Sequence, residues 1–334
     1  MRTNSNPSAG RSIFDRMFVR EFESGQSVDQ VLLVREVEAR RKKDGSEYLK
    51  LILADRTGTV PAVMWEGTSA VAARLPAGSV AQVTGRYAIT ERYGAQLTVS
   101  SLDAADPSDY SLEDLLDGPP RAVDQMEADL RELLSTLQDP WLRDLLDRIL
   151  GEQSDVWRQY RDAPAAKFNH HAYRHGLLEH SLGVAESVSA ISATFPGVNR
   201  DVAVTGALLH DIGKLEAYTQ DPQNIDLTDA GRLQGEIPLG YYRVRREIED
   251  IDGFPAGTAQ AVLHIILSHH GQLEHGSPVL PCTREATLVH MIDNLGGRLG
   301  SFDRLEKELP EGAQWSRFDR TIGGGAFFAG REAA

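Results

Sequence analysis

Histidine and aspartate side chains that could bind a metal ion gather in the second half of the 334-residue chain. All ten histidines lie after residue 169, and the pair His210-Asp211 directly follows an apolar run at 204–209. Imidazole and carboxylate are ligands of borderline to hard divalent ions such as Mn, Fe, Zn or Mg. Two adjacent residues cannot fill a coordination sphere, so the remaining ligands must come from other segments.

Three further apolar segments supply ligands of the same types. His180 lies in the first turns of a helix expected from about Leu177. His269 and His270 end a helix-like run, and Asp293 has apolar neighbours. A buried aspartate without a partner is costly, so Asp293 needs a cation or several donors. For any one of these residues the alternative is a helix cap, a surface histidine or a buried ion pair, but the mixed set favours a site for two ions.

The elements that must position these residues change type along the chain. Residues 27–105 contain several short runs with period-two alternation, such as YLKLILAD, which favour a small β-barrel. Proline and glycine among acidic residues mark a linker near 106–125. Apolar residues then recur three and four positions apart to about residue 309, which predicts helices.

Composition and charge exclude several classes of protein. Cys282 is the only cysteine, so the chain can form neither a disulfide framework nor a thiolate metal cluster, which favours the cytoplasm. The sequence has no signal-peptide core and no apolar run near about 18 residues, so we expect no membrane partner. A net charge of -14 argues against general binding to polyanions, but residues 27–105 hold ten Lys/Arg and nine Asp/Glu, a balance of +1.

The motifs EHS, HDIGK, SHHG and MIDN, in this order, resemble the HD superfamily of metal-dependent phosphohydrolases, which is all-helical. More narrowly, a barrel of OB type followed by HHAYRHGLLEHSL, HDIGKLEAY, LTDAGRLQGEI and ILSHHGQLEHGSPVLPCTREA resembles the YhaM-type 3'-5' exoribonucleases over about residues 15–320. The resemblance implies one metal group made of His180, His210, Asp211 and Asp293, and a second ion that Asp211 shares with His269 and His270.

The resemblance also implies the bounds of the domains, and the chain departs from the family pattern at two places. This chain has Gly235-Glu236-Ile237 where the family is expected to have a histidine, so Glu236 is a candidate ligand whose alternative is a solvated surface carboxylate. The run DNLGG keeps Asp293 but loses a second acid. The prediction is a multidomain α+β protein with a disordered start at 1–14, an OB-fold domain at 15–105, a linker at 106–125, an all-helical HD domain at 126–320 and a flexible tail at 321–334.

Two adjacent divalent ions suit the hydrolysis of phosphate esters, because they activate water and neutralise charge that grows on the phosphoryl group. Lys214, four residues after His210 and expected on the same helical face, is a candidate contact for a phosphate oxygen. His264 and His171 are candidate donors to the substrate or the leaving oxygen, with packing as the alternative. Asp211, Lys214 and His264 are therefore the predicted catalytic residues.

The predicted barrel distinguishes between the candidate substrates, because OB folds bind single-stranded nucleic acid with aromatic and basic residues. Candidates for this contact are Tyr48, Lys50 and Trp65 in the second and third strands, Arg41, Lys42 and Lys43 in the loop before them, and His171 in the helical domain. The alternative is that Trp65 belongs to the core and that the basic residues form a solvated turn.

These features predict a 3'-5' exonuclease that degrades single-stranded RNA, with single-stranded DNA as a second candidate, to nucleoside monophosphates. Its polarity and RNA preference come from the resemblance alone. The expected cofactors are two divalent metal ions, manganese first, with Mg, Fe or another divalent ion as alternatives. Two other functions remain open: an HD phosphohydrolase of a small or cyclic nucleotide with a regulatory barrel, and a nucleic-acid-binding protein without catalysis. The sequence leaves the oligomeric state open.

Overall fold

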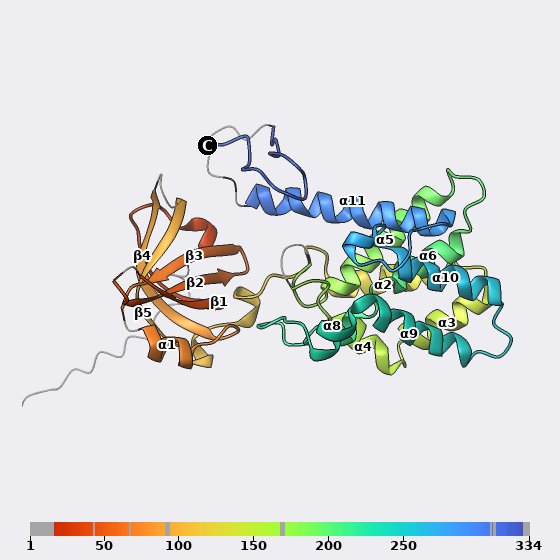
Figure 1. Ribbon diagram of the computed structural model, residues 1–334, viewed down its shortest axis with the longest axis horizontal. Helices are drawn as coiled ribbons and strands as arrows, with labels where there is room; N and C mark the ends of the chain where they lie inside the picture. The colour runs from red at the N-terminus through yellow and green to blue at the C-terminus, as the bar shows by residue number, and fades with distance from the viewer. Residues whose placement is uncertain are drawn as a thin grey trace, which may run out of the picture. The chain divides into compact units, whose positions relative to one another are not determined.

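The chain divides into two compact units, one from residue 1 to Leu116 and one from Asp117 to the C-terminus (Figure 1). The structure is a computed structural model, and it describes residues 17–42, 44–66, 68–90, 94–167, 171–307, 309 and 312–329. It confirms the predicted class, a small β-barrel followed by a helical region. The division between the units falls inside the segment predicted as a linker.

The first unit is a closed barrel of five strands in the order β1-β2-β3-β5-β4. Its strands are β1 (Ser27–Arg41), β2 (Glu47–Asp55), β3 (Gly58–Met64), β4 (Val80–Thr90) and β5 (Gly94–Ala104), with α1 (Thr68–Arg74) between β3 and β4. Neighbouring strands are antiparallel except β3 and β5, which pair in parallel. This arrangement is OB-like. Leu49, Leu51 and Leu53 are fully buried on the inner face, as the alternation predicts.

The barrel closes tightly where β4 bends across β5. The pairing register shifts between Thr84 and Gly85, which marks a bulge. A Cβ atom at Gly85 would lie 2.4 Å from the carbonyl oxygen of Thr98, so the two strands can approach only because residue 85 has no side chain.

The segment after the barrel packs on it before the helices begin. Two 3-10 helices follow the barrel, at Pro107–Asp109 and Leu112–Asp114. Asp106 and Ser111 cap their N-termini, because the side chain of each accepts a hydrogen bond from the backbone. Leu115 is completely buried against Leu33 and Val80 of the barrel. The first helix of the second unit then starts at Val123, before the expected boundary at residue 126.

The second unit is mainly helical in its described part. Its longer helices are α2 (Val123–Ser135), α3 (Pro140–Leu150), α4 (Asp155–Asp162), α5 (Gly176–Ser192), α6 (Arg200–Leu209), α9 (Glu236–Glu249), α10 (Ala256–Ser268) and α11 (Arg284–Lys307), and its shorter ones are α7 (Lys214–Ala217), α8 (Asp229–Gln234) and a 3-10 turn at Leu273–His275. None of the helices in the described part of the chain is both long and apolar enough to span a bilayer.

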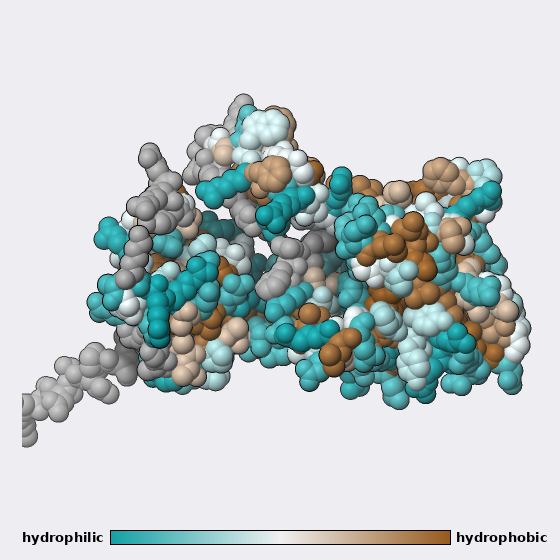
Figure 2. Space-filling view, viewed as in Figure 1, coloured by the Kyte–Doolittle hydropathy of each residue, from teal (hydrophilic) through white to brown (hydrophobic). Residues whose placement is uncertain are grey.

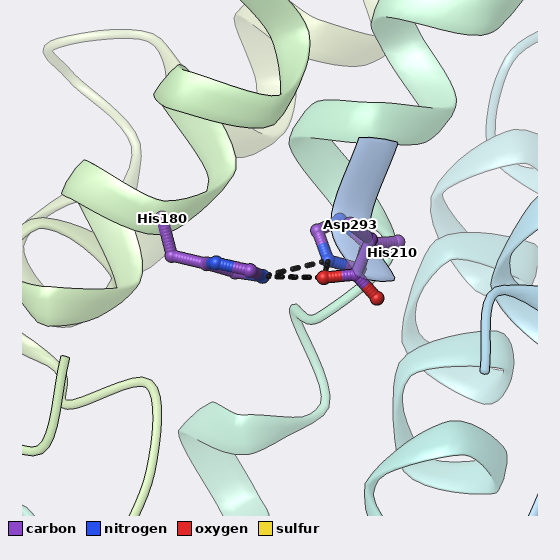
Figure 3. A group of neighbouring side chains, drawn as sticks. All are labelled: His180, His210 and Asp293. Atoms are coloured by element: carbon purple, nitrogen blue, oxygen red, sulfur yellow. Dashed lines mark hydrogen bonds and ion pairs between the residues drawn. The ribbon is translucent and has the colours of Figure 1, made fainter. Parts of the chain in front are cut away.

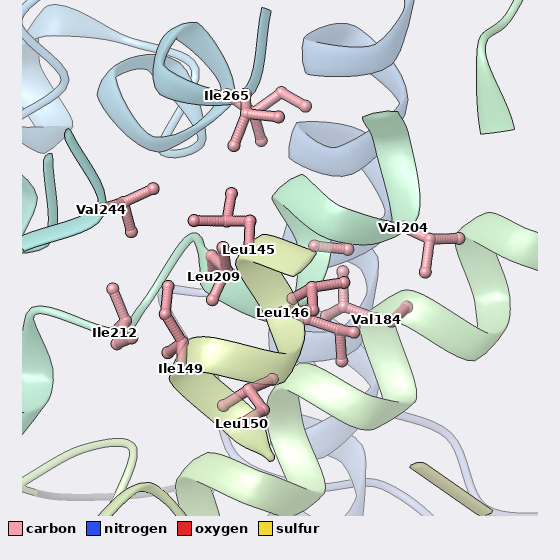
Figure 4. Close-up of a cluster of buried hydrophobic side chains, with 14 of the residues drawn as sticks. Leu145, Leu146, Ile149, Leu150, Val184, Val204, Leu209, Ile212, Val244 and Ile265 are labelled. Carbon is pink, nitrogen blue, oxygen red and sulfur yellow. The ribbon is translucent and has the colours of Figure 1, made fainter. Parts of the chain in front are cut away.

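One hydrophobic core holds these helices together. Figure 4 shows side chains from α3, α5, α6, α9 and α10 meeting in it, among them Leu145, Ile149, Val184, Leu209, Val244 and Ile265. Eight residues of α6, from Val202 to Leu209, are buried, so this helix runs through the centre of the unit. A helix that is apolar on all sides is expected in such a place. On the outside, the viewed face of the unit is mostly hydrophilic, with some hydrophobic side chains among the polar ones (Figure 2).

The segment predicted as a flexible tail at 321–334 overlaps a C-terminal segment whose contacts the structure describes. Residues 312–329 form a hairpin-like segment with bridges between Trp315 and Phe327 and between Asp319 and Gly324. Arg304 of α11 forms an ion pair with Asp319, with 2.5 Å between the two atoms. Only residues 330–334 of the predicted tail, like the predicted disordered start at 1–14, lie outside the described residues.

Substituting Gly85 tests the tight closure of the barrel. Gly85→Ala should lower the free energy of unfolding by about 1–3 kcal/mol, because the new methyl group meets the backbone at Thr98. Chemical denaturation of the full chain measures this change. Gly118→Ala is the matched control, because no atom lies within 4 Å of its Cβ position. Equal stabilities of the two variants would contradict the steric explanation.

Candidate metal centre

The pair His210-Asp211 lies where the central helix ends. The Asn199 side chain accepts a hydrogen bond from the backbone of Val202 and so caps the start of α6, whose last residue is Leu209. His210 and Asp211 follow immediately and are both buried. The chain then turns at Gly213, where a Cβ atom would lie 1.9 Å from the carbonyl oxygen of Glu236, so the start of α9 packs directly on this turn.

Three segments bring the first group of ligands together. His180 comes from α5, His210 from the end of α6 and Asp293 from α11 (Figure 3). The Nε2 atoms of His180 and His210 are 3.1 Å apart, and Oδ1 of Asp293 lies 3.2 Å from the first and 3.9 Å from the second. The three ligand atoms therefore converge on one point, as four-coordinate and six-coordinate ions require.

Asp211, His269 and His270 form a second group beside the first. The two carboxylate oxygens of Asp211 face different groups. Oδ2 lies 3.2 Å from Nε2 of His180, and Oδ1 lies 3.5 Å from Nε2 of His269. This is the geometry of a carboxylate that could bridge two ions.

Backbone carbonyl groups orient the histidine rings. The Nδ1 atoms of His210 and His269 lie 2.7 Å and 2.8 Å from carbonyl oxygens three residues earlier, at Ala207 and Ile266. Nδ1 of His270 lies 2.8 Å from the carbonyl oxygen of His275. A carbonyl oxygen only accepts, so each Nδ1 carries the proton and each Nε2 offers its lone pair to the site.

Two buried polar atoms in this cluster have no hydrogen-bond partner among the described residues. They are Oδ1 of Asp211 and Nε2 of His269, which face each other. Buried polar atoms without partners are rare and need an explanation. Both are ligand types for the same ions, so a divalent metal fits this pair and the residues around it.

Opposite charges change the pKa values of the cluster. Burial alone would lower the pKa of His180, but hydrogen bonds to Asp211 and Asp293 outweigh burial and raise it to about 9. Burial would raise the pKa of both aspartates, but nearby groups outweigh it. Lys214 and His210 lower the pKa of Asp211, and His180 and His210 lower the pKa of Asp293. The carboxylates thus remain ionised, as ligands must be.

Lys214 lies in the cluster, although not in the predicted way. The helix that carries His210 has already ended, and Lys214 begins the separate short helix α7. Its Nζ lies 2.6 Å from Oδ2 of Asp211, and this ion pair helps to raise its pKa against the effect of burial. Glu236 starts α9, and its Oε1 lies 3.5 Å from Nε2 of His270, so it borders the second group.

The two histidines expected to contact the substrate have different positions. The predicted catalytic residue His264 belongs to neither metal group: its Nε2 accepts a hydrogen bond from the backbone of Cys282 at 2.9 Å, so it supports a loop. His171 is buried, and its ring lies 5.4 Å from that of His180. Its backbone has φ of 59°, a strained value for a residue with a side chain.

Sequence analysis overlooked His290 and His275. Nδ1 of His290 lies 2.7 Å from the carbonyl oxygen of His269 and so supports the ligand-bearing turn. Its spacing of three residues from Asp293 on one helix was a usable signal. His275 acts through its carbonyl group on His270, which no residue-type pattern could reveal.

The predicted aromatic and basic residues of the barrel also meet. Tyr48 and Trp65 stack with ring centroids 5.2 Å apart, and Nζ of Lys42 lies 4.9 Å from the Trp65 centroid. Trp65 is 46% exposed, so it is not a core residue, and it follows β3 instead of lying in it. Lys50 is exposed on β2.

Arg41 is the last residue of β1 and not part of the predicted basic loop, and it lies 3.6 Å from Glu47. Lys43 lies outside the described residues.

Comparisons with known proteins indicate the family of the chain. The HD domain family matches residues 177–297, a range that contains the candidate ligands from His180 to Asp293. A curated relative, the 3'-5' exoribonuclease YhaM of Geobacillus sp. (strain WCH70), is 31% identical over 291 residues, which are 86% of this chain and 88% of the relative.

Two solved structures share limited likeness with the chain. The second OB-fold domain of replication protein A from Methanococcus maripaludis has 18% identity and a TM-score of 0.22, and covers 27% of this chain and 95% of its own. Aspartyl tRNA synthetase from Entamoeba histolytica has 10% identity and a TM-score of 0.19, and covers 51% of this chain and 35% of its own. At these scores neither likeness carries an argument.

An OB-like barrel joined to an HD domain with clustered histidine and aspartate ligands defines a metal-dependent hydrolase. The sequence identity to the YhaM relative, and the share of both chains over which it holds, assign the chain to a narrower family. The chain belongs to the family of the YhaM 3'-5' exoribonucleases.

Removing the central carboxylate tests the metal centre. Asp211→Asn should lower the metal content of the purified protein by at least about tenfold, because it replaces an ionised ligand that faces both groups. Elemental analysis measures the metal, and added metal should raise the melting temperature of the wild type but not of the variant. Asp226→Asn, which alters a carboxylate paired with Lys167, is the control. Equal metal contents would show that Asp211 is not a ligand.

Proposed function

We propose that this protein is a 3'-5' exonuclease that hydrolyses single-stranded RNA to nucleoside monophosphates, with single-stranded DNA as a second candidate substrate. We propose two divalent ions as its cofactors, manganese first, and the cytoplasm as its location. The observation that carries the proposal is the Asp211 carboxylate, with one oxygen toward each group of histidines. Membership of the exoribonuclease family supports the polarity and the substrate class.

The donor set fits two ions that share Asp211. His180, His210 and Asp293 would hold one, and His269 and His270 the other, with Glu236 beside the second group. When bound, such ions supply an activated water and positive charge opposite the phosphoryl oxygens. The protein contributes rings that are already oriented by backbone carbonyls, so little reorganisation is needed when the substrate arrives.

Lys214 is the residue of this chain best suited to contact the phosphate. Its ammonium group is held at the cluster by Asp211 and has no competing hydroxyl or carbonyl partner among the contacts described for it. Once an ion occupies Asp211, the lysine would be repelled and freed to approach a non-bridging phosphate oxygen. Such a cation offsets the charge that grows in the transition state.

The barrel supports a polymeric substrate. The exposed Trp65, stacked on Tyr48 beside Lys42, combines an aromatic face with a positive charge. Single-strand-binding barrels use this combination to stack bases and to contact phosphates without reading sequence. A hydrolase of free nucleotides would not need such a surface to hold its substrate.

The first test follows a 5'-labelled single-stranded RNA over time with Mn, Mg or a chelator. We expect a ladder that shortens from the 3' end only when metal is present. The same reaction with free and cyclic nucleotides is the control for substrate class. An intact strand together with turnover of small nucleotides would overturn the exonuclease proposal in favour of a small-nucleotide phosphohydrolase. A bound strand without turnover of either would favour a nucleic-acid-binding protein.

Lys214→Met tests the role of the lysine. The substitution keeps the apolar stem and removes the charge, so we expect kcat for RNA to fall about a hundredfold while the metal content stays unchanged. Steady-state kinetics and elemental analysis measure the two effects. Lys167→Met removes a lysine that pairs with Asp226 and is the control. If kcat and metal content fall together, the lysine holds Asp211 in place instead of acting on the substrate.

A further inference from the structure

A cavity of about 570 Å³ in the helical unit extends from the metal centre along α11. Its lining begins at Asp293, the α11 ligand of the first group, and continues through Ser301 to Arg304. These positions lie eight and eleven residues after Asp293, so they share one face of the helix. Eleven residues of helix span about 16 Å, which is the length of a few nucleotides at roughly 3.4 Å per nucleotide of a stacked strand.

The lining is basic in a chain whose net charge is -14. Arg298, Arg304 and Arg320 all contribute to it. Arg304 is engaged by Asp319. By contrast, Arg298 and Arg320 are exposed and form no ion pair within the described part of the chain. Two guanidinium groups without carboxylate partners, next to a phosphate-hydrolysing site, favour an anionic ligand.

The C-terminal hairpin holds Arg320 in this position. Oδ1 of Asp319 accepts hydrogen bonds from the backbone of Thr321 and Ile322, at 2.9 Å and 3.2 Å, while Oδ2 pairs with Arg304 of α11. Phe328 contacts Phe302 of α11, with ring centroids 6.3 Å apart. The turn that carries Arg320 is therefore fixed to the helix that carries Asp293.

The same hairpin exposes aromatic rings. Trp315 is 64% exposed and Phe318 is 72% exposed. Trp315 also lies against Phe327, with ring centroids 4.9 Å apart, so its ring has a defined orientation. Phe318 and Trp315 precede Arg320 by two and five residues in this hairpin. Exposed rings together with arginines form the combination that binds single strands, where each stacked base contributes about 1–3 kcal/mol.

We propose that this cavity and hairpin are the path of the single-stranded substrate in the helical unit. Arg298 and Arg320 bind phosphates of the nucleotides that precede the cleaved one, and Trp315 stacks on a base of the same stretch. The residues of this path all belong to the helical unit, whereas Tyr48 and Trp65 belong to the barrel. This inference rests on the proposed function, since it presumes that the substrate is a strand.

The test compares full-length wild type with the double variant Arg298→Gln and Arg320→Gln. Its KM for a short single-stranded RNA should rise about tenfold, and the slope of log affinity against log salt should decrease in magnitude by about 1.4. Turnover of a small chromogenic phosphodiester, which reaches only the metal centre, should stay at the wild-type rate. The control is Arg143→Gln with Arg158→Gln, which removes the same charge from two exposed positions on α3 and α4.

The other possible outcomes would overturn either the path or the proposed function. A wild-type KM, or an equal rise in the control, overturns the path. Loss of turnover of the small diester overturns it too, because the arginines would then serve the metal centre. If the wild type hydrolyses the small diester but leaves RNA intact, the proposed function fails, and this result is distinct from failure of the path.

A second variant tests stacking. Trp315→Ala should raise KM for the RNA about tenfold without changing turnover of the small diester. Phe195→Ala, which removes an exposed ring between α5 and α6, should leave KM unchanged. Melting temperatures show whether each variant is folded. A folded Trp315→Ala protein with wild-type KM would remove stacking from the proposal.

Discussion

The structure of the helical unit depends on one buried carboxylate. Asp211 lies at the end of the central helix, with Lys214 and His180 on one oxygen and His269 on the other. An ionised group in this place would destabilise the fold without counter-charges. Lys214 comes from the segment directly after Asp211, whereas His180 and His269 come from helical segments distant in sequence, so the packing of the apolar core brings these groups to the carboxylate.

The barrel and the helical unit differ in how they place the residues singled out as candidate binding sites. Strand alternation places leucines inside the barrel and Tyr48 and Lys50 on its outer face, and Trp65 is exposed directly after β3. The helices instead bury their candidate ligands, among them His210 and His269. An exposed surface suits binding with little selectivity, whereas a buried cluster suits chemistry that requires fixed geometry.

Sequence patterns pointed to the candidate ligands because these residues interrupt apolar segments. Asp293 and His210 are conspicuous for this reason, and the structure brings them within 3.9 Å. The patterns failed where position depends on a turn. Lys214 was expected on the helix of His210, but that helix ends at Leu209. His264 was expected to donate to the substrate, but its Nε2 accepts a hydrogen bond from the backbone of Cys282. The glycine-rich C-terminus has no periodicity, so its hairpin, held by Asp319 and Phe328, could not be predicted.

The hydrogen bonds to the histidine rings have a consequence for evolution. In many metal sites a distant carboxylate orients each ligand ring, so a substitution there changes the site. Here the acceptors for His210 and His269 are main-chain oxygens one helical turn earlier. Any residue supplies such an oxygen. Divergence among relatives can therefore change the neighbouring side chains freely while the tautomers of these two ligands persist.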